Sequence, residues 1–163
     1  MTVEKINREK QLIEEAKKVL KGKIVWILDS SPAGKSIADF LTRLTPEKVI
    51  IFNNYVELGN TFRDESQLPQ PVNLPHLIIA DIDELYDIED KKPISPSGFL
   101  NIFQFFSSVS QTETSLPQTI FTSADPIDSK TKEQIQKCKS AWLEKPFGLA
   151  SLYEKITQAL SQT

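Results

Sequence analysis

Short apolar runs alternate with stretches of helical periodicity along most of the chain, and this alternation constrains the fold more than any other feature. The segments KIVWIL, KVIIF, HLIIA, QTIFT and SAWLE each contain a short block of apolar residues, and apolar residues at helical spacing lie between them. Strands that are apolar on both faces are typical of parallel sheets covered by helices on both sides. The sequence therefore predicts one α/β domain with a doubly wound sheet of five parallel strands.

A charged segment, residues 3–20, precedes the first apolar run and has the pattern of a helix. Ile6, Ile13 and Leu20 lie a heptad apart, and Gly22 follows where a helix would end. This stripe has two interpretations, which are packing against the helix's own domain and a short dimerisation helix. Association is slightly favoured because the rest of the helix is charged and suited to water. We expect a helical extension, residues 1–22, followed by one domain, residues 23–163.

Charge, cysteine and histidine content exclude several classes of function. The net charge is −3, and residues 1–23 carry seven basic and four acidic residues, so the remainder is acidic and offers no basic face for nucleic acid. One cysteine, Cys138, excludes an internal disulfide, and one histidine, His76, excludes a histidine-rich zinc site. No apolar stretch has the length of a membrane span or a secretory signal. We expect a cytoplasmic protein with no nucleic-acid partner and no membrane insertion.

Residues 29–36, which end in the letters GKS, are similar to the phosphate-binding loop G-x-x-x-x-G-K-[ST] of nucleotide hydrolases. Asp29 stands in place of the first glycine, however, and Pro32 removes one backbone N–H from the phosphate cradle. The segment HLIIAD also resembles the strand whose aspartate holds Mg²⁺ in such enzymes. A degenerate P-loop nucleotide-binding protein is therefore one alternative, although Ser31 and Pro32 also have the pattern of a helix N-cap and first helical residue.

Polar residues follow four of the predicted strands at their carboxyl ends. Asp29 follows the first strand, Asp81 the third, Thr122 the fourth, and Lys145 the fifth. In a parallel α/β sheet these positions meet in one crevice. Two carboxylates can hold a divalent cation, and a lysine and a hydroxyl can contact a phosphoryl group, so the set predicts phosphoryl transfer to an aspartate.

The motifs WILDSS, LIIAD, IFTSAD and WLEKPF, in this order, resemble the receiver domains of bacterial response regulators in two-component signalling. The resemblance covers roughly residues 23–161 and implies a flavodoxin-like strand order. It implies that Asp81 is the phosphoacceptor, that Lys145 contacts the acceptor and its phosphate, and that Thr122 moves toward the phosphoryl oxygen. It also implies that Trp142 is the aromatic residue that reorients with this hydroxyl, and that the bond before Pro146 is cis.

Two departures from the family pattern concern the metal site. The family has two adjacent acids after the first strand, but Ser30 stands at the second position, so we expect Asp29 and Asp81 to bind Mg²⁺ weakly. A long segment, residues 83–97, replaces the usual tight turn after the third strand. One of its carboxylates, with Asp83 as the candidate ligand, could replace the missing acid. The acids of this segment are Asp83, Glu84, Asp87, Glu89 and Asp90.

The resemblance implies a signalling protein and not an enzyme. Because no output domain follows Thr163, we expect a stand-alone receiver that signals through a downstream protein or as a homodimer. Its phosphodonor would be a sensor histidine kinase or a phosphotransfer protein, and its cofactor Mg²⁺. The alternative within the same fold is a pseudo-receiver that binds partners without phosphate, which Ser30 and the long segment favour.

Overall fold

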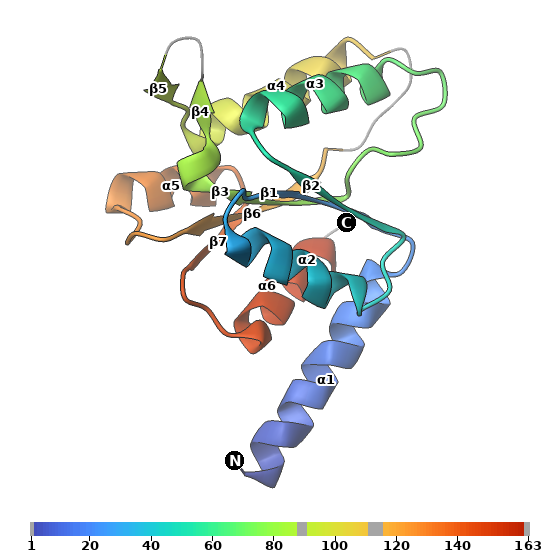
Figure 1. Ribbon diagram of the computed structural model, residues 1–163, viewed down its shortest axis with the longest axis vertical. Helices are drawn as coiled ribbons and strands as arrows, with labels where there is room; N and C mark the ends of the chain where they lie inside the picture. Colours follow the sequence, from blue (N-terminus) through green and yellow to red (C-terminus); the bar gives the residue numbers. More distant parts are fainter. Residues whose placement is uncertain (1, 88–90, 111–115, 162–163) are drawn as a thin grey trace.

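A five-stranded parallel sheet forms the centre of the computed structural model, which describes residues 2–87, 91–110 and 116–161. Its strand order is β2-β1-β3-β6-β7, the doubly wound order of flavodoxin-like folds, so the fold prediction is confirmed. Figure 1 shows helices on both faces of this sheet. The strands are β1 (Ile24–Leu28), β2 (Lys48–Phe52), β3 (Leu77–Asp81), β6 (Gln118–Ser123) and β7 (Ala141–Glu144).

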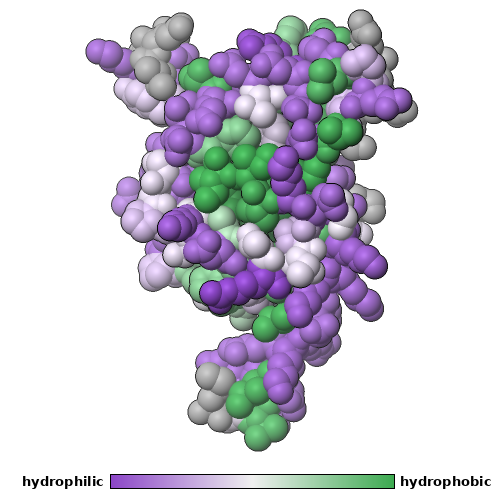
Figure 2. All heavy atoms as spheres, turned by 45° about the vertical axis from the view of Figure 1, so that its right-hand side comes forward, coloured by the Kyte–Doolittle hydropathy of each residue, from purple (hydrophilic) through white to green (hydrophobic). Residues whose placement is uncertain are grey.

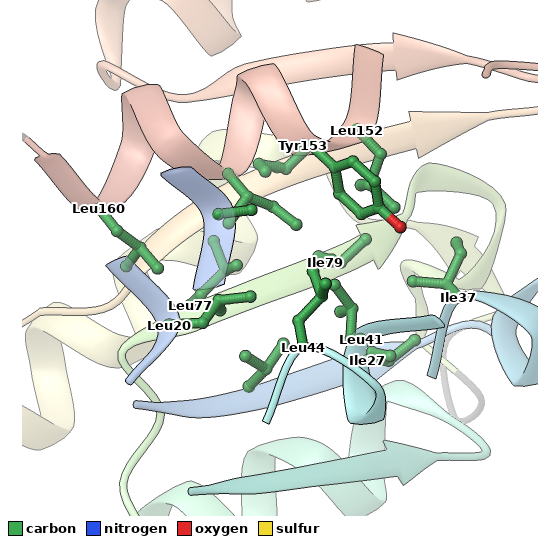
Figure 3. Packing of buried hydrophobic residues seen from close by; sticks show 14 of the residues in the cluster. Leu20, Ile27, Ile37, Leu41, Leu44, Leu77, Ile79, Leu152, Tyr153 and Leu160 are labelled. Atoms are coloured by element: carbon green, nitrogen blue, oxygen red, sulfur yellow. The ribbon is translucent and has the colours of Figure 1, made fainter. Parts of the chain in front are cut away.

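Alternating residues of the strands supply two apolar cores, one on each face of the sheet. Ile27 and Ile79 face the first core, and Figure 3 shows them between leucines and isoleucines of the covering helices. Trp26 and Ile78 face the second core, which is rich in phenylalanine. The first core is covered by α1 (Val3–Leu20), α2 (Pro32–Thr42) and α6 (Leu149–Ser161), and the second by α3 (Tyr55–Ser66), α4 (Pro96–Ser108) and α5 (Ser129–Lys137).

The N-terminal helix α1 packs along α6 with its second half. Leu12, Ala16 and Leu20 are buried in the first core, whereas Ile6 is 38% exposed on the half that extends away from the domain (Figure 1). The contact with the helix's own domain, the less favoured of our two interpretations, is therefore present for the second half. Dimerisation through the exposed half stays a prediction. In the described part of the chain, no helix has both the length and the apolar character needed to cross a bilayer.

The segment after β3 contains structure that the sequence did not predict. A short 3₁₀ helix, η1 (Ile82–Glu84), follows the strand directly and leads into an antiparallel hairpin of β4 (Tyr86–Asp87) and β5 (Lys92–Pro93). Leu85 lies between these elements and is buried in the second core. The segment is thus anchored beside the carboxyl end of β3.

Candidate functional site

A partly buried lysine joins two buried carboxylates at the carboxyl edge of the sheet. Lys145 Nζ donates to Asp29 Oδ2 at 2.8 Å and to Asp81 Oδ2 at 2.7 Å. The side chains of Asp29, Asp81 and Lys145 are 2%, 7% and 16% exposed. The three residues follow or end β1, β3 and β7, which is why a parallel sheet brings them together.

The second oxygen of each aspartate also accepts a hydrogen bond. Asp29 Oδ1 accepts from the backbone N–H of Ser31 at 2.9 Å and from its hydroxyl, and Asp81 Oδ1 accepts from the backbone N–H of Asp83 at 3.0 Å. Ser31 is the N-cap residue of α2, as predicted, but its hydroxyl makes no cap bond to the helix. The two turns after β1 and β3 therefore fix the orientation of both carboxylates.

Protonation in this cluster is governed by opposing effects. Burial alone would lower the pKa of Lys145, but hydrogen bonds and charge from Asp29 and Asp81 outweigh it and raise that pKa above its ordinary value, so the lysine is charged. The pKa of Asp83 is raised, mainly by burial and to a smaller extent by the negative charges of Asp81 and Asp125. The site consequently combines two buried carboxylates with one cation and carries excess negative charge.

Thr122 places a hydroxyl beside Asp81. The two residues are register partners in neighbouring parallel strands, so their side chains lie on the same face of the sheet. Thr122 is fully buried, and its Oγ1 has no hydrogen-bond partner. A buried hydroxyl without a partner costs about 1–3 kcal/mol, so this one is available to an oxygen ligand. The adjacent Ser123 is different, because its hydroxyl donates to the Asp125 carbonyl at 2.6 Å.

Ser30 contacts an acid that the sequence pattern did not single out. Its backbone N–H donates to Glu84 Oε1 at 3.1 Å, and its hydroxyl donates to the same oxygen. Glu84 ends η1, whereas the predicted ligand Asp83 has an exposed side chain and reaches Asp81 through its backbone. The acidity of residues 83–97 was the only signal in the sequence. Of the other acids in that segment, Glu89 and Asp90 lie outside the described residues.

Trp142 lies on β7, three residues before Lys145, and is partly buried against the second core. The ammonium group of Lys132 lies 5.9 Å from the centre of its ring, within the range of a cation–π contact, and also 3.6 Å from Glu144 Oε1. The Lys145–Pro146 bond is cis, as the resemblance implied. The predicted switch residue is therefore held in the contact between β7 and α5.

The donor set at this edge fits Mg²⁺. Within residues 2–87, 91–110 and 116–161, no group of three or more histidine, cysteine or acidic side chains is arranged to hold a metal ion. Mg²⁺ does not need such a group, since it usually binds one or two carboxylates together with water and phosphate oxygens. Asp29 and Asp81 supply two buried carboxylates, and the unpaired Thr122 hydroxyl suits a phosphoryl oxygen.

The structure gives the P-loop-like residues another role. Gly34 lies in the first turn of α2, so close to the end of β1 that a Cβ atom there would lie 2.2 Å from the Asp29 carbonyl oxygen, and glycine is therefore required by packing. Lys35 is exposed on α2, and the lysine at the site is Lys145. The GKS stretch is thus explained by the approach of a helix to a strand and does not require a nucleotide.

No family model and no curated protein matches the sequence. Among solved structures, one similar to this chain is the receiver domain of the histidine kinase CKI1 from Arabidopsis thaliana, complexed with Mg²⁺ and BeF₃⁻. The match covers 93% of this chain and 97% of the CKI1 chain, with a TM-score of 0.64 at 12% identity. The chain has the receiver fold. A response regulator receiver protein from Burkholderia phymatum also has it, with a TM-score of 0.57 at 16% identity and coverage of 85% of this chain and 95% of its own. The receiver domain of Ssk1 from Saccharomyces cerevisiae, solved with the phosphotransfer protein Ypd1, has a TM-score of 0.61 at 16% identity and coverage of 88% and 92%.

Proposed function

We propose that this chain is a two-component receiver that accepts a phosphoryl group on Asp81 and signals through protein contacts. The observation that carries the proposal is the cluster of Asp29, Lys145 and Asp81 at the carboxyl edge of a receiver-type sheet, with the unpaired Thr122 hydroxyl beside it. Receiver folds alone do not determine function, so the proposal rests on this set of side chains.

In the proposed reaction, a carboxylate oxygen of Asp81 attacks the phosphorus atom of the donor. The bond between phosphorus and the donor's leaving atom breaks, and the leaving group takes the electron pair. Lys145, which already contacts Asp81, offsets the charge of the acyl phosphate, and Thr122 donates to a phosphoryl oxygen. Mg²⁺, held by Asp29 and Asp81, would neutralise charge on the transferred group. The chain thus acts as a phosphoacceptor switch and not as a turnover enzyme.

The phosphodonor in this proposal is a sensor histidine kinase or a phosphotransfer protein, as the Ssk1 receiver complex with Ypd1 suggests. An open apolar groove between α2 and the loop before α6 adjoins Lys145 and offers a surface for such a protein. The groove is lined by residues that include Ala33, Ile37, Phe40, Phe147 and Leu149. The downstream partner would bind the face built from α5, β7 and α6, where Trp142 lies.

A pseudo-receiver that binds partners without phosphate is the second candidate. Lys145 already neutralises part of the charge of both carboxylates, and Ser30 replaces an acid. In this candidate the lysine alone balances the two carboxylates, and the site would need no metal ion. The two candidates differ in one measurable property, which is covalent uptake of phosphate.

The test is the intact mass of the full chain after incubation with acetyl phosphate and Mg²⁺. We expect wild type to gain one phosphoryl group, Asp81→Asn to gain none, and Asp39→Asn, which changes an exposed acid on α2, to behave as wild type. Omission of Mg²⁺ should abolish the gain. If wild type gains no mass even at high Mg²⁺ concentration, the phosphoacceptor proposal is wrong and the pseudo-receiver candidate is favoured.

A further inference from the structure

Glu84 places a third carboxylate near the end of β1, next to Ser30. In the receiver pattern that the sequence resembles, an acid stands at position 30. Its Oε1 accepts two hydrogen bonds from Ser30, one from the backbone N–H at 3.1 Å and one from the hydroxyl. Ser30 directly follows Asp29, which carries the first carboxylate of the site. Glu84 is therefore joined to the end of β1 from a segment 54 positions later in the chain.

The backbone after Asp81 explains why Glu84 lies there. Asp81 is the N-cap residue of η1 and accepts a hydrogen bond from the Asp83 N–H, which turns the chain immediately after β3. Leu85, the next residue, is 1% exposed in the second core and anchors the end of this turn. Glu84 lies between these two fixed points, so its contact with Ser30 is built into the fold of the inserted segment.

We propose that Glu84 supplies the carboxylate that is missing at position 30: its side chain, held by Ser30 in this structure, would turn to join Asp29 and Asp81 around a divalent cation. The inference rests on the proposed function and names a ligand-binding residue for the same site. The charges support it, since Lys145 is the cation that contacts both Asp29 and Asp81, and Glu84 adds a further carboxylate beside the residue that follows Asp29.

The Thr122 hydroxyl is a second, independent observation that points to a ligand here. It is fully buried, lies on the same face of the sheet as Asp81, and has no hydrogen-bond partner. The described protein atoms leave this hydroxyl unsatisfied, which a phosphoryl oxygen accompanying the cation would correct. The contact between Ser30 and Glu84 has a purely structural explanation as well, namely that it ties the turn after β1 to η1. Metal affinity separates the two explanations.

The experiment is calorimetric titration of the full chain with Mg²⁺, and with Mn²⁺ as a second probe. We expect Glu84→Gln to raise the Kd about tenfold or more, and the double variant Glu84→Gln with Ser30→Asp to return it close to the wild-type value. Glu133→Gln, which changes an exposed acid on α5, should have the wild-type Kd. Ser30→Asp alone should bind more tightly than wild type.

Two outcomes would contradict different parts of this proposal. Equal Kd values for wild type and Glu84→Gln, with a loss of stability in the variant, would show that Glu84 only ties the turn, and the proposed function would stand if the mass assay still shows phosphate on Asp81. Unchanged Mg²⁺ binding in Asp81→Asn would instead place the metal outside this site and contradict the proposed function itself.

Discussion

Replacing Lys145 by methionine should destabilise the protein strongly, because it leaves two buried carboxylates without a cation. The two Oδ2 atoms that contact Nζ, at 2.8 Å and 2.7 Å, can be no farther apart than the sum of these distances. Two negative charges about 5 Å apart repel by about 3 kcal/mol at an effective dielectric of about 20. Loss of one partner from a buried ion pair costs about 3–5 kcal/mol in other proteins. We expect the free energy of unfolding to fall by an amount in this range.

The second substitution in this series removes one of the carboxylates. Asp81→Asn alone leaves Asp29 paired with Lys145, and the free energy of unfolding should change by less than about 1 kcal/mol. Added to Lys145→Met, Asp81→Asn removes the repulsion between the carboxylates, so the double variant should recover about 2 kcal/mol or more relative to Lys145→Met alone. The effects of the two substitutions are therefore expected to be strongly non-additive.

The assay is urea unfolding at pH 7 with a chelator present, followed by circular dichroism and by tryptophan fluorescence, to which the buried Trp26 and the partly buried Trp142 both contribute. The chelator matters because a bound divalent cation would stabilise the native state of Lys145→Met and hide the effect. A Lys145→Met protein as stable as wild type, or additive effects of the two substitutions, would refute the electrostatic account of this cluster.

Three further predictions concern single positions. Thr122→Val should leave the free energy of unfolding unchanged or raise it by about 1 kcal/mol, because the hydroxyl has no partner; a clear loss in urea unfolding would contradict this. Gly34→Ala should lower it by about 1–3 kcal/mol, since the new Cβ would meet the Asp29 carbonyl oxygen, whereas the control Gly59→Ala, which has open space around it, should be neutral or stabilising. Burial lowers the pKa of His76 below its ordinary value of about 6.5. As the pH falls, the unfolded chain therefore binds a proton at His76 before the folded chain does, and the free energy of unfolding should decrease below about pH 6.5. In His76→Gln the free energy of unfolding should depend less on pH between about pH 7.5 and 5.

The central sheet could be predicted because burial on both faces leaves a direct record in the sequence. A strand such as Ile24–Leu28 is buried at every position, so it is apolar at every position, and no distant residue is needed to recognise it. The positions of Asp29, Asp81, Thr122 and Lys145 follow from the same regularity, because the carboxyl ends of parallel strands meet at one edge. These parts of the site depend only on where each strand ends.

The N-terminal helix shows where a local pattern is insufficient. Ile6 and Leu20 belong to one heptad stripe, yet Leu20 is fully buried and Ile6 is 38% exposed. The helix extends beyond the surface against which its second half packs, and the length of that surface is set by α6, far away in the sequence. The buried face is marked by Leu12, Ala16 and Leu20. Helical periodicity predicted the helix, but not how much of it the domain would cover.

The apolar surface of the domain likewise depends on distant parts of the chain. Figure 2 shows an apolar patch on the surface of the domain. The edge strand β2 contributes exposed apolar surface, since its Ile51 is 38% exposed. From the sequence, KVIIF predicts a strand buried on both faces. The edge position of β2 is a property of strand order, which the composition of the strand does not encode.

The relation between Ser30 and Glu84 can be recognised only from the sequence pattern and the three-dimensional contacts together. Ser30 departs from the family pattern at one position, and the segment after Asp81 departs from it at another, so the sequence presents two separate irregularities. In the structure they are one feature, because Glu84 of the segment after Asp81 accepts hydrogen bonds from Ser30. A serine at position 30 without an acid at position 84 would leave only Asp29 and Asp81 for a cation, and an acid at both positions would add a further charge to a site that has one lysine. The serine at position 30 and the acid at position 84 are therefore expected to be functionally coupled, and the double variant Glu84→Gln with Ser30→Asp tests this coupling, which neither single variant can do alone.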